Sequence, residues 1–463
     1  MPGNTSDLDV VTRLRAIRQG RAQLVTTHRQ AALHAHALVL APVAMAGENV
    51  TVHAIAYGRV GQITPTILTV PDPRRRDDQG RLLRRLAHDI DVYVRDCQQQ
   101  GCYPQLIVSC YAAAQYLDLL SERLRRLRDD PDVQWMGEYL AHATHRLPVP
   151  GQQALHMATR VLAAHWVQGY DTGADEHLGV ALTWIDPPSG TPLDAALASA
   201  GRGVMGIKTD VEWDRHVLAP LVAAYARAVR SGSRQPIAGA ASIDAALTSI
   251  VTPVYHAIQR AVALVRECGL PPLPALGYMD EIEHDAFARF WERLNAGKYT
   301  PARENPRTAA YTLATRLVAG DNYDAALLAD DRVTQARAQI EGRLVVGVVV
   351  GTDIGGTGGE RILTVLSWQD TLRVRPGDRL YWAPQPRLSC ILRALVRTDE
   401  GTHLTLTVTS GMRTVRCPTA GEGIMLLPAV PDWDRGRRES YKMWGRRTDV
   451  PWSRRSDDPA PHK

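Results

Sequence analysis

The chain has 463 residues, of which 45% are hydrophobic, so its length predicts about three domains with ordinary buried cores. Lysine and arginine number 54 against 49 aspartates and glutamates, and this net charge of +5 argues against a polyanion-binding surface over the whole molecule. Arginine supplies nearly all the positive charge, a bias typical of a GC-rich bacterial genome. The six cysteines form no Cys-x-x-Cys pair and predict reduced, mostly buried thiols. No stretch approaches about 18 apolar residues, so we expect neither a signal peptide nor a membrane span, and a cytoplasmic protein.

Residues 1–150 predict an α/β domain. A helix is expected from Asp7 to about Leu33, followed by strands within residues 36–45, 50–59 and 63–70. The short turns between these strands predict antiparallel neighbours.

A second helix is expected after residue 76, where leucines, isoleucine and valine recur at helical spacing at Leu82, Leu83, Leu86, Ile90 and Val94. A fourth apolar strand within residues 105–111 and a further leucine-rich helix complete the order β-β-β-α-β-α.

Residues 151–339 predict a helical domain, because several segments with broad apolar faces are separated by Pro/Gly-rich breaks. Residues 340–432 contain five or six short β-branched runs between Gly, Asp and Pro turns, which predict a small closed β-barrel. Residues 433–463 lack an apolar period, and we expect a flexible basic tail.

This element order resembles the N-terminal part of bacterial superfamily-1 helicase/nuclease proteins, in which a ribonuclease H-like region and helices precede an accessory β-barrel. The resemblance rests on the order of elements, on Arg375-Pro376-Gly377-Asp378-Arg379-Leu380 between two strands, and on the closing run 418–430. It implies an α+β multidomain fold with a ribonuclease H-like α/β domain. The motor is missing, because no GxxxxGK[ST] loop occurs and the Gly-rich run 351–359 has no lysine and predicts a hairpin turn.

The resemblance implies a two-Mg²⁺ site held by carboxylates that begin on the first strand. Residues 36–45 contain no carboxylate, so we expect the site to be dismantled and assign no catalytic residue. The alternative is a Mg²⁺-dependent nuclease whose carboxylates are drawn after folding from Glu48, Asp72, Asp89 and Asp91.

Other groups of potentially metal-binding or reactive residues can also be explained by roles in the fold alone. The histidine pairs His34/His36 and His142/His145 could chelate a metal, or be chance pairs among 15 histidines. The spacing from Glu281 to His284 is that of a di-iron helix motif, but no second copy exists, and its acids favour a helix start. We therefore expect no metal centre and no cofactor. Cys110 ends an apolar strand and predicts a buried thiol.

Two clusters of basic residues are candidates for contacts with phosphate groups. Residues 74–76 are three arginines that either contact phosphates or form a helix start balanced by Asp77 and Asp78. The tail carries nine Lys/Arg against four Asp/Glu from residue 435 on, which equals the whole net excess. Arginines neutralise phosphates and aromatic rings stack on unpaired bases, so these tail residues are the predicted nucleic-acid contacts: Arg435, Arg437, Arg438, Tyr441, Lys442, Trp444, Arg446, Arg447, Trp452, Arg454 and Arg455. The alternative is a tail that docks on a protein.

The leading hypothesis is therefore a non-catalytic accessory subunit in nucleic-acid processing, in bacterial genome maintenance or defence. It would bind DNA rather than RNA and pair with a separately encoded helicase or nuclease. The alternatives are the Mg²⁺-dependent nuclease and a purely protein-binding scaffold.

Overall fold

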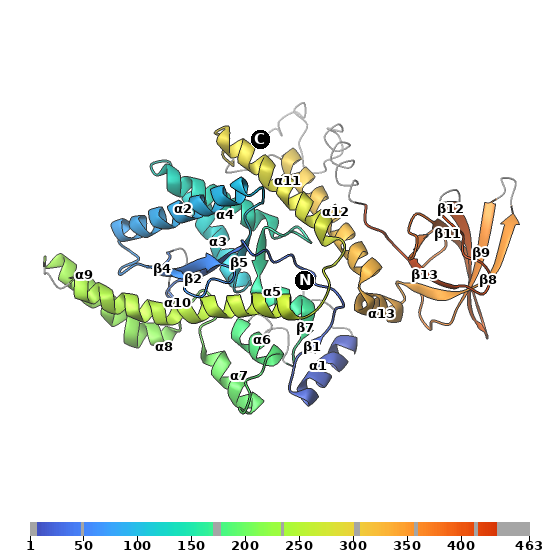
Figure 1. Cartoon of the computed structure of the whole chain (residues 1–463), viewed down its shortest axis with the longest axis horizontal. Coiled ribbons are helices and arrows are strands. Elements are labelled where there is room, and N and C mark those ends of the chain that lie inside the picture. Colours follow the sequence, from blue (N-terminus) through green and yellow to red (C-terminus); the bar gives the residue numbers. More distant parts are fainter. Residues whose placement is uncertain are drawn as a thin grey trace, which may run out of the picture.

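The computed structural model describes residues 7–47, 51–169, 177–232, 236–300, 306–355, 360–411 and 415–432. The protein is α+β, with a mixed sheet, a closed barrel and helices around and between them (Figure 1). The strands are β1 Gln23–Leu24, β2 Leu38–Val43, β3 Ala54–Arg59, β4 Thr66–Thr69, β5 Leu106–Val108, β6 Leu155–Met157, β7 Trp166–Val167, β8 Val345–Gly355, β9 Glu360–Ser367, β10 Arg379–Trp382, β11 Ser389–Thr398, β12 Gly401–Ser410 and β13 Gly423–Leu427.

The helices are α1 Asp7–Gln19, α2 Arg76–Gln99, α3 Tyr111–Leu124, α4 Pro131–Arg146, α5 Ala158–His165, α6 Leu178–Ile185, α7 Leu193–Arg202, α8 Val211–Trp213, α9 Ala219–Arg230, α10 Pro236–Glu267, α11 Leu276–Asn295, α12 Pro306–Asp330 and α13 Arg332–Ile340. A π-helical turn, η2 (Asp214–Leu218), joins α8 to α9.

The five-stranded sheet has the order β4-β3-β2-β5-β6. The strands β2, β3 and β4 are antiparallel neighbours, as the short turns predicted, whereas β5 and β6 run parallel to β2. Every residue of the central strand β2 is buried. Side chains alternate across a strand, so Leu38 and Leu40 enter one hydrophobic core while Val39, Ala41 and Val43 enter the other.

Helices cover both faces of this sheet. The helices α2, α3 and α4 pack on the face of Leu40, and all five apolar positions predicted for α2, from Leu82 to Val94, are buried there. The opposite face is covered by the 32-residue helix α10, which contacts β2, β3 and β4 and also packs on α5 and α6 (Figure 1). The sheet is therefore the middle of three layers.

The structure corrects two sequence-based expectations. The first helix was expected to reach Leu33 but ends at Gln19, because Gly20 has a φ of +62° and closes the helix. The domain boundary was placed at residue 150, yet β6 and the covering helix α10 lie beyond it. The α/β unit thus includes much of the segment predicted to be a separate helical domain.

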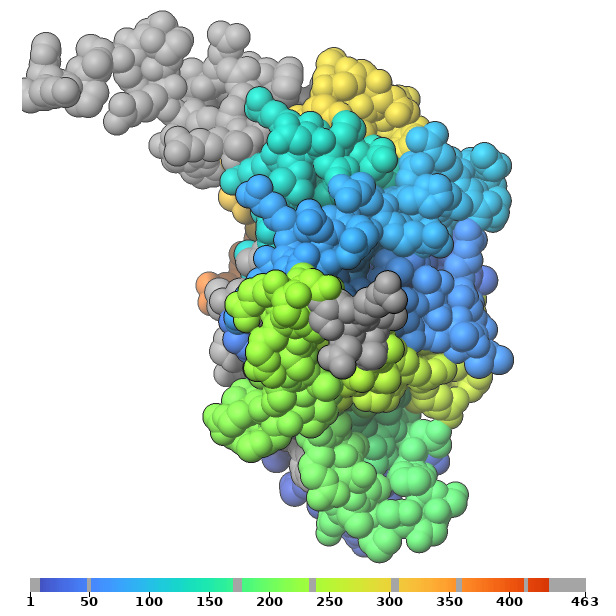
Figure 2. Space-filling model, turned by 90° about the vertical axis from the view of Figure 1, so that its left-hand side faces the viewer, coloured from blue at the N-terminus to red at the C-terminus, as the bar shows by residue number. Residues whose placement is uncertain are grey.

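The segment from α8 to α9 lies beside the start of α2 (Figure 2). The Tyr225 hydroxyl of α9 is 3.5 Å from the Asp78 carboxylate of α2. Asp78 is buried and also pairs with Arg75 and Arg81, so both basic side chains are held at the helix start.

The C-terminal strands close into a six-stranded antiparallel barrel of order β10-β11-β12-β9-β8-β13. The strands β8 and β9 pair as the predicted hairpin, but residues 351–355 of the Gly-rich run, which were expected in the turn, form the end of β8, with Gly355 opposite Glu360. The Pro-Gly-Asp turn precedes β10, where Gly377 has a φ of +97° that favours glycine. Leucines, valines and Trp382 fill the interior.

The barrel is joined to the α/β unit through α12 and α13. Buried Asp331 caps α13 by accepting a bond from the Thr334 amide (2.8 Å), and it also accepts hydrogen bonds from Thr26 (2.9 Å) and Thr27 (2.8 Å) near the N-terminus. Leu328, Ala338, Leu344 and Leu427 form a small core between these helices and the barrel.

Packing between α3 and α4 depends on Gly137. A Cβ added there would lie 2.4 Å from the backbone nitrogen of Arg125, which cannot move aside as a side chain could. We expect Gly137→Ala to lower the free energy of unfolding by about 1–3 kcal/mol. Gly277→Ala on α11, where nothing lies within 4 Å, should raise it by about 0.5–1 kcal/mol. Urea unfolding of both variants measures this, and equal stabilities would contradict the close packing.

Candidate functional site

The sheet has two edges at which polar side chains gather. At the edge where β2, β5 and β6 end, α3 and α5 begin, and neither helix has a side-chain cap. The guanidinium of Arg160 lies 5.3 Å from the centre of the Tyr111 ring at this edge. Two open helix N-termini, an arginine and an exposed aromatic ring together favour anions over cations.

The carboxylates considered for a nuclease do not gather at this edge. Glu48 lies outside the described residues. Asp72 follows β4 and accepts the Arg74 amide (3.1 Å), but Asp89 is 13 residues into α2, about 20 Å along the helix.

Both helical carboxylates are committed to neighbours. Asp89 accepts the Tyr57 hydroxyl (2.5 Å) and the Arg85 guanidinium (2.9 Å), and Asp91 pairs with Arg95 (2.8 Å). Burial and the hydrogen bond to Asp89 raise the pKa of Tyr57 above its ordinary value. These carboxylates therefore act as partners of α2 and β3 and do not converge with Asp72 on a metal ion.

A segment before α8 covers the end of β2, where a ribonuclease H-like site would begin. Ala44 forms a parallel β-bridge with Lys208, and the Lys208 ammonium donates to the Met45 carbonyl (3.3 Å). The Ala46 amide donates to Thr209 (3.1 Å) and Asp214 (2.7 Å). The Lys208 ammonium and the buried Asp214 carboxylate thus both lie near this end of β2, and both are hydrogen-bonded to the backbone there.

A second polar cluster lies at the opposite edge, where β2 and β5 begin. The Tyr103 hydroxyl donates to Asp280 of α11 (2.6 Å), and the His34 Nε2 is 3.1 Å from that hydroxyl and 3.2 Å from the carboxylate. Burial raises the pKa of Asp280, but hydrogen bonds from His34 and Tyr103 outweigh it and leave this pKa below its ordinary value. Gln105 joins the cluster by accepting the His34 amide (3.0 Å).

Beside this cluster, one ligand atom each from His36, Cys97 and Cys102 lie within 4.8 Å of one another. In the described part of the chain, this is the one group of three His, Cys, Asp or Glu side chains close enough to share an ion. Sequence reasoning missed it, because it looked for Cys-x-x-Cys. The available signal was a helix end followed by glycine, in the run Cys97-Gln-Gln-Gln-Gly101-Cys102.

The other predicted metal-binding patterns separate in the structure. His142 is stacked on Phe290 with ring centres 4.4 Å apart, whereas His145 faces Asp118 and Glu122 at 3.8 Å. Burial, with nearby positive charges, lowers the pKa of His142 to about 3.

Within the Glu-x-x-His pattern, Glu281 and His284 are exposed and the buried residue is Glu283. Glu283 forms a two-bond ion pair with Arg146 of α4, at 2.7 and 3.0 Å. The helix α11 begins at Leu276, with no acid in its first turn, so the expected role of these acids in helix initiation is wrong. Glu283 instead attaches α11 to α4.

The predicted structural readings of two other features hold. Cys110 is buried at the end of β5. Among the three arginines at residues 74–76, Arg75 pairs with Asp78, which agrees with a balanced helix start.

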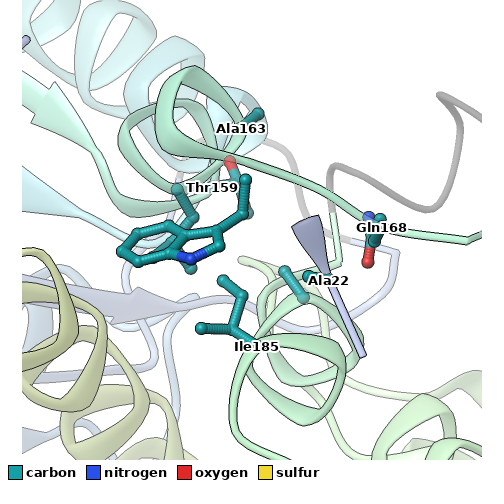
Figure 3. A pocket seen from close by; sticks show the side chains of 8 residues that line it. Ala22, Thr159, Ala163, Gln168 and Ile185 are labelled. Carbon is teal, nitrogen blue, oxygen red and sulfur yellow. The ribbon is translucent and has the colours of Figure 1, made fainter. Parts of the chain in front are cut away.

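Two pockets offer little chemistry. Between α5 and α6, a small space is lined by Ala22, Thr159, Ala163, Gln168 and Ile185 among others, none of which titrates (Figure 3). A groove between α12 and the end of the barrel is lined by four ionisable side chains, of Asp321, Asp324, Arg343 and Asp432, with apolar neighbours.

The predicted nucleic-acid contacts in the tail all lie outside the described residues, which end at Asp432. On the barrel, Arg379 of β10 and Arg393 of β11 are exposed. Arg393 donates to Thr407 of β12 (3.1 Å), and Arg379 lies 3.5 Å from Ser389. Within the described ranges, neither arginine forms an ion pair. Ser389 and Thr407 are themselves buried, so the exposed side chains of Arg379 and Arg393 form what we call the arginine face.

In comparisons with family models, curated proteins and solved structures, nothing matches this chain. Among the helices in the described ranges, none has the length and apolar character needed to cross a membrane.

The imidazole of His142 predicts acid sensitivity, because its Nε2 is buried although the residue as a whole is only partly buried. In the unfolded chain histidine takes up a proton near pH 6.5, whereas the folded His142 does so only near pH 3, so acidification favours unfolding between these values. Between pH 7 and 5 this residue should cost about 2 kcal/mol of stability. We expect the pH-dependent loss to shrink by that amount in His142→Leu and not in His88→Gln, an exposed histidine on α2. Urea unfolding at both pH values measures it, and identical losses in both variants would contradict the burial.

Proposed function

We propose that this chain is a non-catalytic accessory subunit in nucleic-acid processing, acting beside a separately encoded helicase or nuclease. Its α/β unit is, in this proposal, a ribonuclease H-like domain that lost its metal site. Support comes from the sheet: three antiparallel strands are followed by two strands parallel to the first, with helices before each parallel strand.

The observation that carries the non-catalytic part is the state of β2. The strand has the sequence LVLAPV, which contains no carboxylate, and every residue of it is buried. Asp214, a buried carboxylate near its end, accepts the Ala46 amide beside the Lys208 ammonium. A pair of Mg²⁺ ions needs several converging carboxylates, and Asp72 and Asp89 lie too far apart to provide them.

The nucleic-acid part is supported by the basic and aromatic side chains of the tail and by the arginine face. Arginine side chains bind phosphate oxygens, and the exposed Arg379 and Arg393 are each positioned by a contact to a buried hydroxyl, that of Ser389 or Thr407. Charge from the arginine face and stacking from Trp444 and Trp452 would together suit a single strand. DNA is the proposed ligand, and the partner would be positioned by the barrel.

The binding test uses the full chain and a fluorescent single-stranded DNA at several salt concentrations. Removing residues 435–463 should weaken binding and flatten the salt dependence, because each lost phosphate contact lowers the slope by about 0.7. Trp444→Ala and Trp452→Ala should each cost about 1–3 kcal/mol of single-strand binding.

Arg379→Ala/Arg393→Ala should weaken binding further, whereas Arg416→Ala, which removes an arginine already paired with Glu422 on the same barrel, should not. Absence of any affinity at low salt would overturn the proposal and leave the protein-binding scaffold. Loss of a co-purifying protein on truncation, with DNA affinity unchanged, would assign the tail to protein docking.

The nuclease alternative is tested separately with labelled single- and double-stranded DNA and RNA in Mg²⁺ or Mn²⁺. We expect no cleavage, because the described carboxylates do not converge. Cleavage that disappears in Glu48→Ala or Asp72→Ala, but persists in Asp91→Ala, would show an active site at the end of the sheet and refute the non-catalytic reading.

A further inference from the structure

The end of α2 brings two cysteines together through its backbone. The Cys102 amide donates to the Cys97 carbonyl (2.9 Å) and the Gly101 amide donates to the Gln98 carbonyl (3.0 Å), which is the pair of bonds of a Schellman motif. Gly101 has the required positive φ of +69°. The motif turns the chain back over the last helical turn, so Cys102 lies above Cys97 even though five positions separate them.

An imidazole from another element completes the group. His36 lies two residues before β2, and its Nε2 lies 3.1 Å from the Tyr103 carbonyl, to which it donates. Metal-binding histidines commonly make this bond with one ring nitrogen, because it fixes the ring and the tautomer. Stacking on His34, with ring centres 4.9 Å apart, holds the ring from one face.

We propose that His36, Cys97 and Cys102 bind one Zn²⁺ ion, with a solvent molecule as the fourth ligand. Two thiolates and one neutral imidazole are the ligands that zinc prefers over calcium or magnesium. Two thiolates also cancel the charge of the ion, which suits a site where Cys97 is fully buried.

The separations between the three ligand atoms fit a tetrahedral zinc site after a small contraction of the group. Tetrahedral zinc with Zn–S bonds of about 2.3 Å places neighbouring ligand atoms about 3.7 Å apart. The three ligand atoms already lie within 4.8 Å. Cys102 is only partly buried, so a solvent molecule can occupy the fourth ligand position, and the ion can enter from that side.

Zinc binds thiolates and a neutral imidazole, so uptake of the ion by this group would release the thiol protons of Cys97 and Cys102.

The ion would join the end of α2 to the beginnings of β2 and β5. It stands beside the Arg59–Asp96 ion pair and the His34–Asp280 contact, which attach β3 and α11 at the same edge. A Zn²⁺ ion here would therefore stabilise the attachment of α2 to the sheet.

The test uses the full chain, purified under reducing conditions, stripped with a chelator and titrated with Co²⁺ and then Zn²⁺. We expect one Co²⁺ per chain, with the visible bands of tetrahedral cobalt and thiolate charge-transfer absorption, both displaced by Zn²⁺. His36→Ala, Cys97→Ala and Cys102→Ser should each weaken binding by at least about 10–100-fold, the loss typical of milder outer-shell changes.

Cys268→Ser is the matched control, because Cys268 is also a partly buried cysteine at a helix end whose thiol donates to its own helix, at Val265 (3.0 Å). It should bind Co²⁺ like the unchanged chain. Should Cys97→Ala fail to fold, the partly exposed Cys102 variant still decides the question.

Two results would overturn the proposal. Six titratable thiols with no Co²⁺ uptake would show a simple pair of buried thiols. Four titratable thiols in the denatured chain purified without reductant, with no uptake after reduction, would show that Cys97 and Cys102 form a disulfide instead.

Discussion

Burial of β2 on both faces is the constraint on which the rest of the α/β unit depends. A strand buried in this way must satisfy its backbone polar groups through its neighbours, and β3 pairs along its whole length while β5 pairs at Leu38 and Val39. It must also present apolar side chains both ways, to α2–α4 and to α10. The same requirement removes room for an ionised side chain, since an unpaired buried charge is costly. A strand so built serves as a packing element, and chemistry has to take place at its ends.

The two ends of the sheet differ accordingly. At the carboxyl ends of β2 and β5, Lys208 and two open helix N-termini favour negative charge, and the buried Asp214 carboxylate lies there. At the amino ends, histidines, thiols and Asp280 gather in a cluster that suits a soft cation. The two edges of one sheet thus favour ions of opposite charge, and the length of the strands separates them.

Local patterns predicted much of the fold. The three antiparallel strands, the buried face of α2 and the hairpin of β8 and β9 followed from periodicity and turn residues, which are properties of neighbouring positions. The end of α1 was available as well, because Gly20 closes it by the same pair of backbone bonds as Gly101 closes α2.

What local patterns could not supply was contact between distant segments. The periodicity of α10 shows an apolar face but does not say that this face covers β2, some 200 residues earlier in the chain. The ion pair of Glu283 with Arg146 and the proximity of His36 to Cys97 are likewise contacts between segments that are distant in the sequence. The ribonuclease H-like relationship, the tail contacts and Glu48 remain predictions from the sequence.

The several hydrogen bonds that Asp331 accepts determine where the chain can be cut into separate fragments. One buried carboxylate begins α13 and also holds Thr26 and Thr27, so the helix leading into the barrel is anchored to the N-terminal segment. A cut at residue 340 would keep that anchor but expose the apolar surfaces of Leu344 and Leu427. A cut between Asp331 and α13 would separate the capping carboxylate from the helix that it caps. The barrel and the α/β unit should therefore be kept together when the chain is divided, because they are not independent modules.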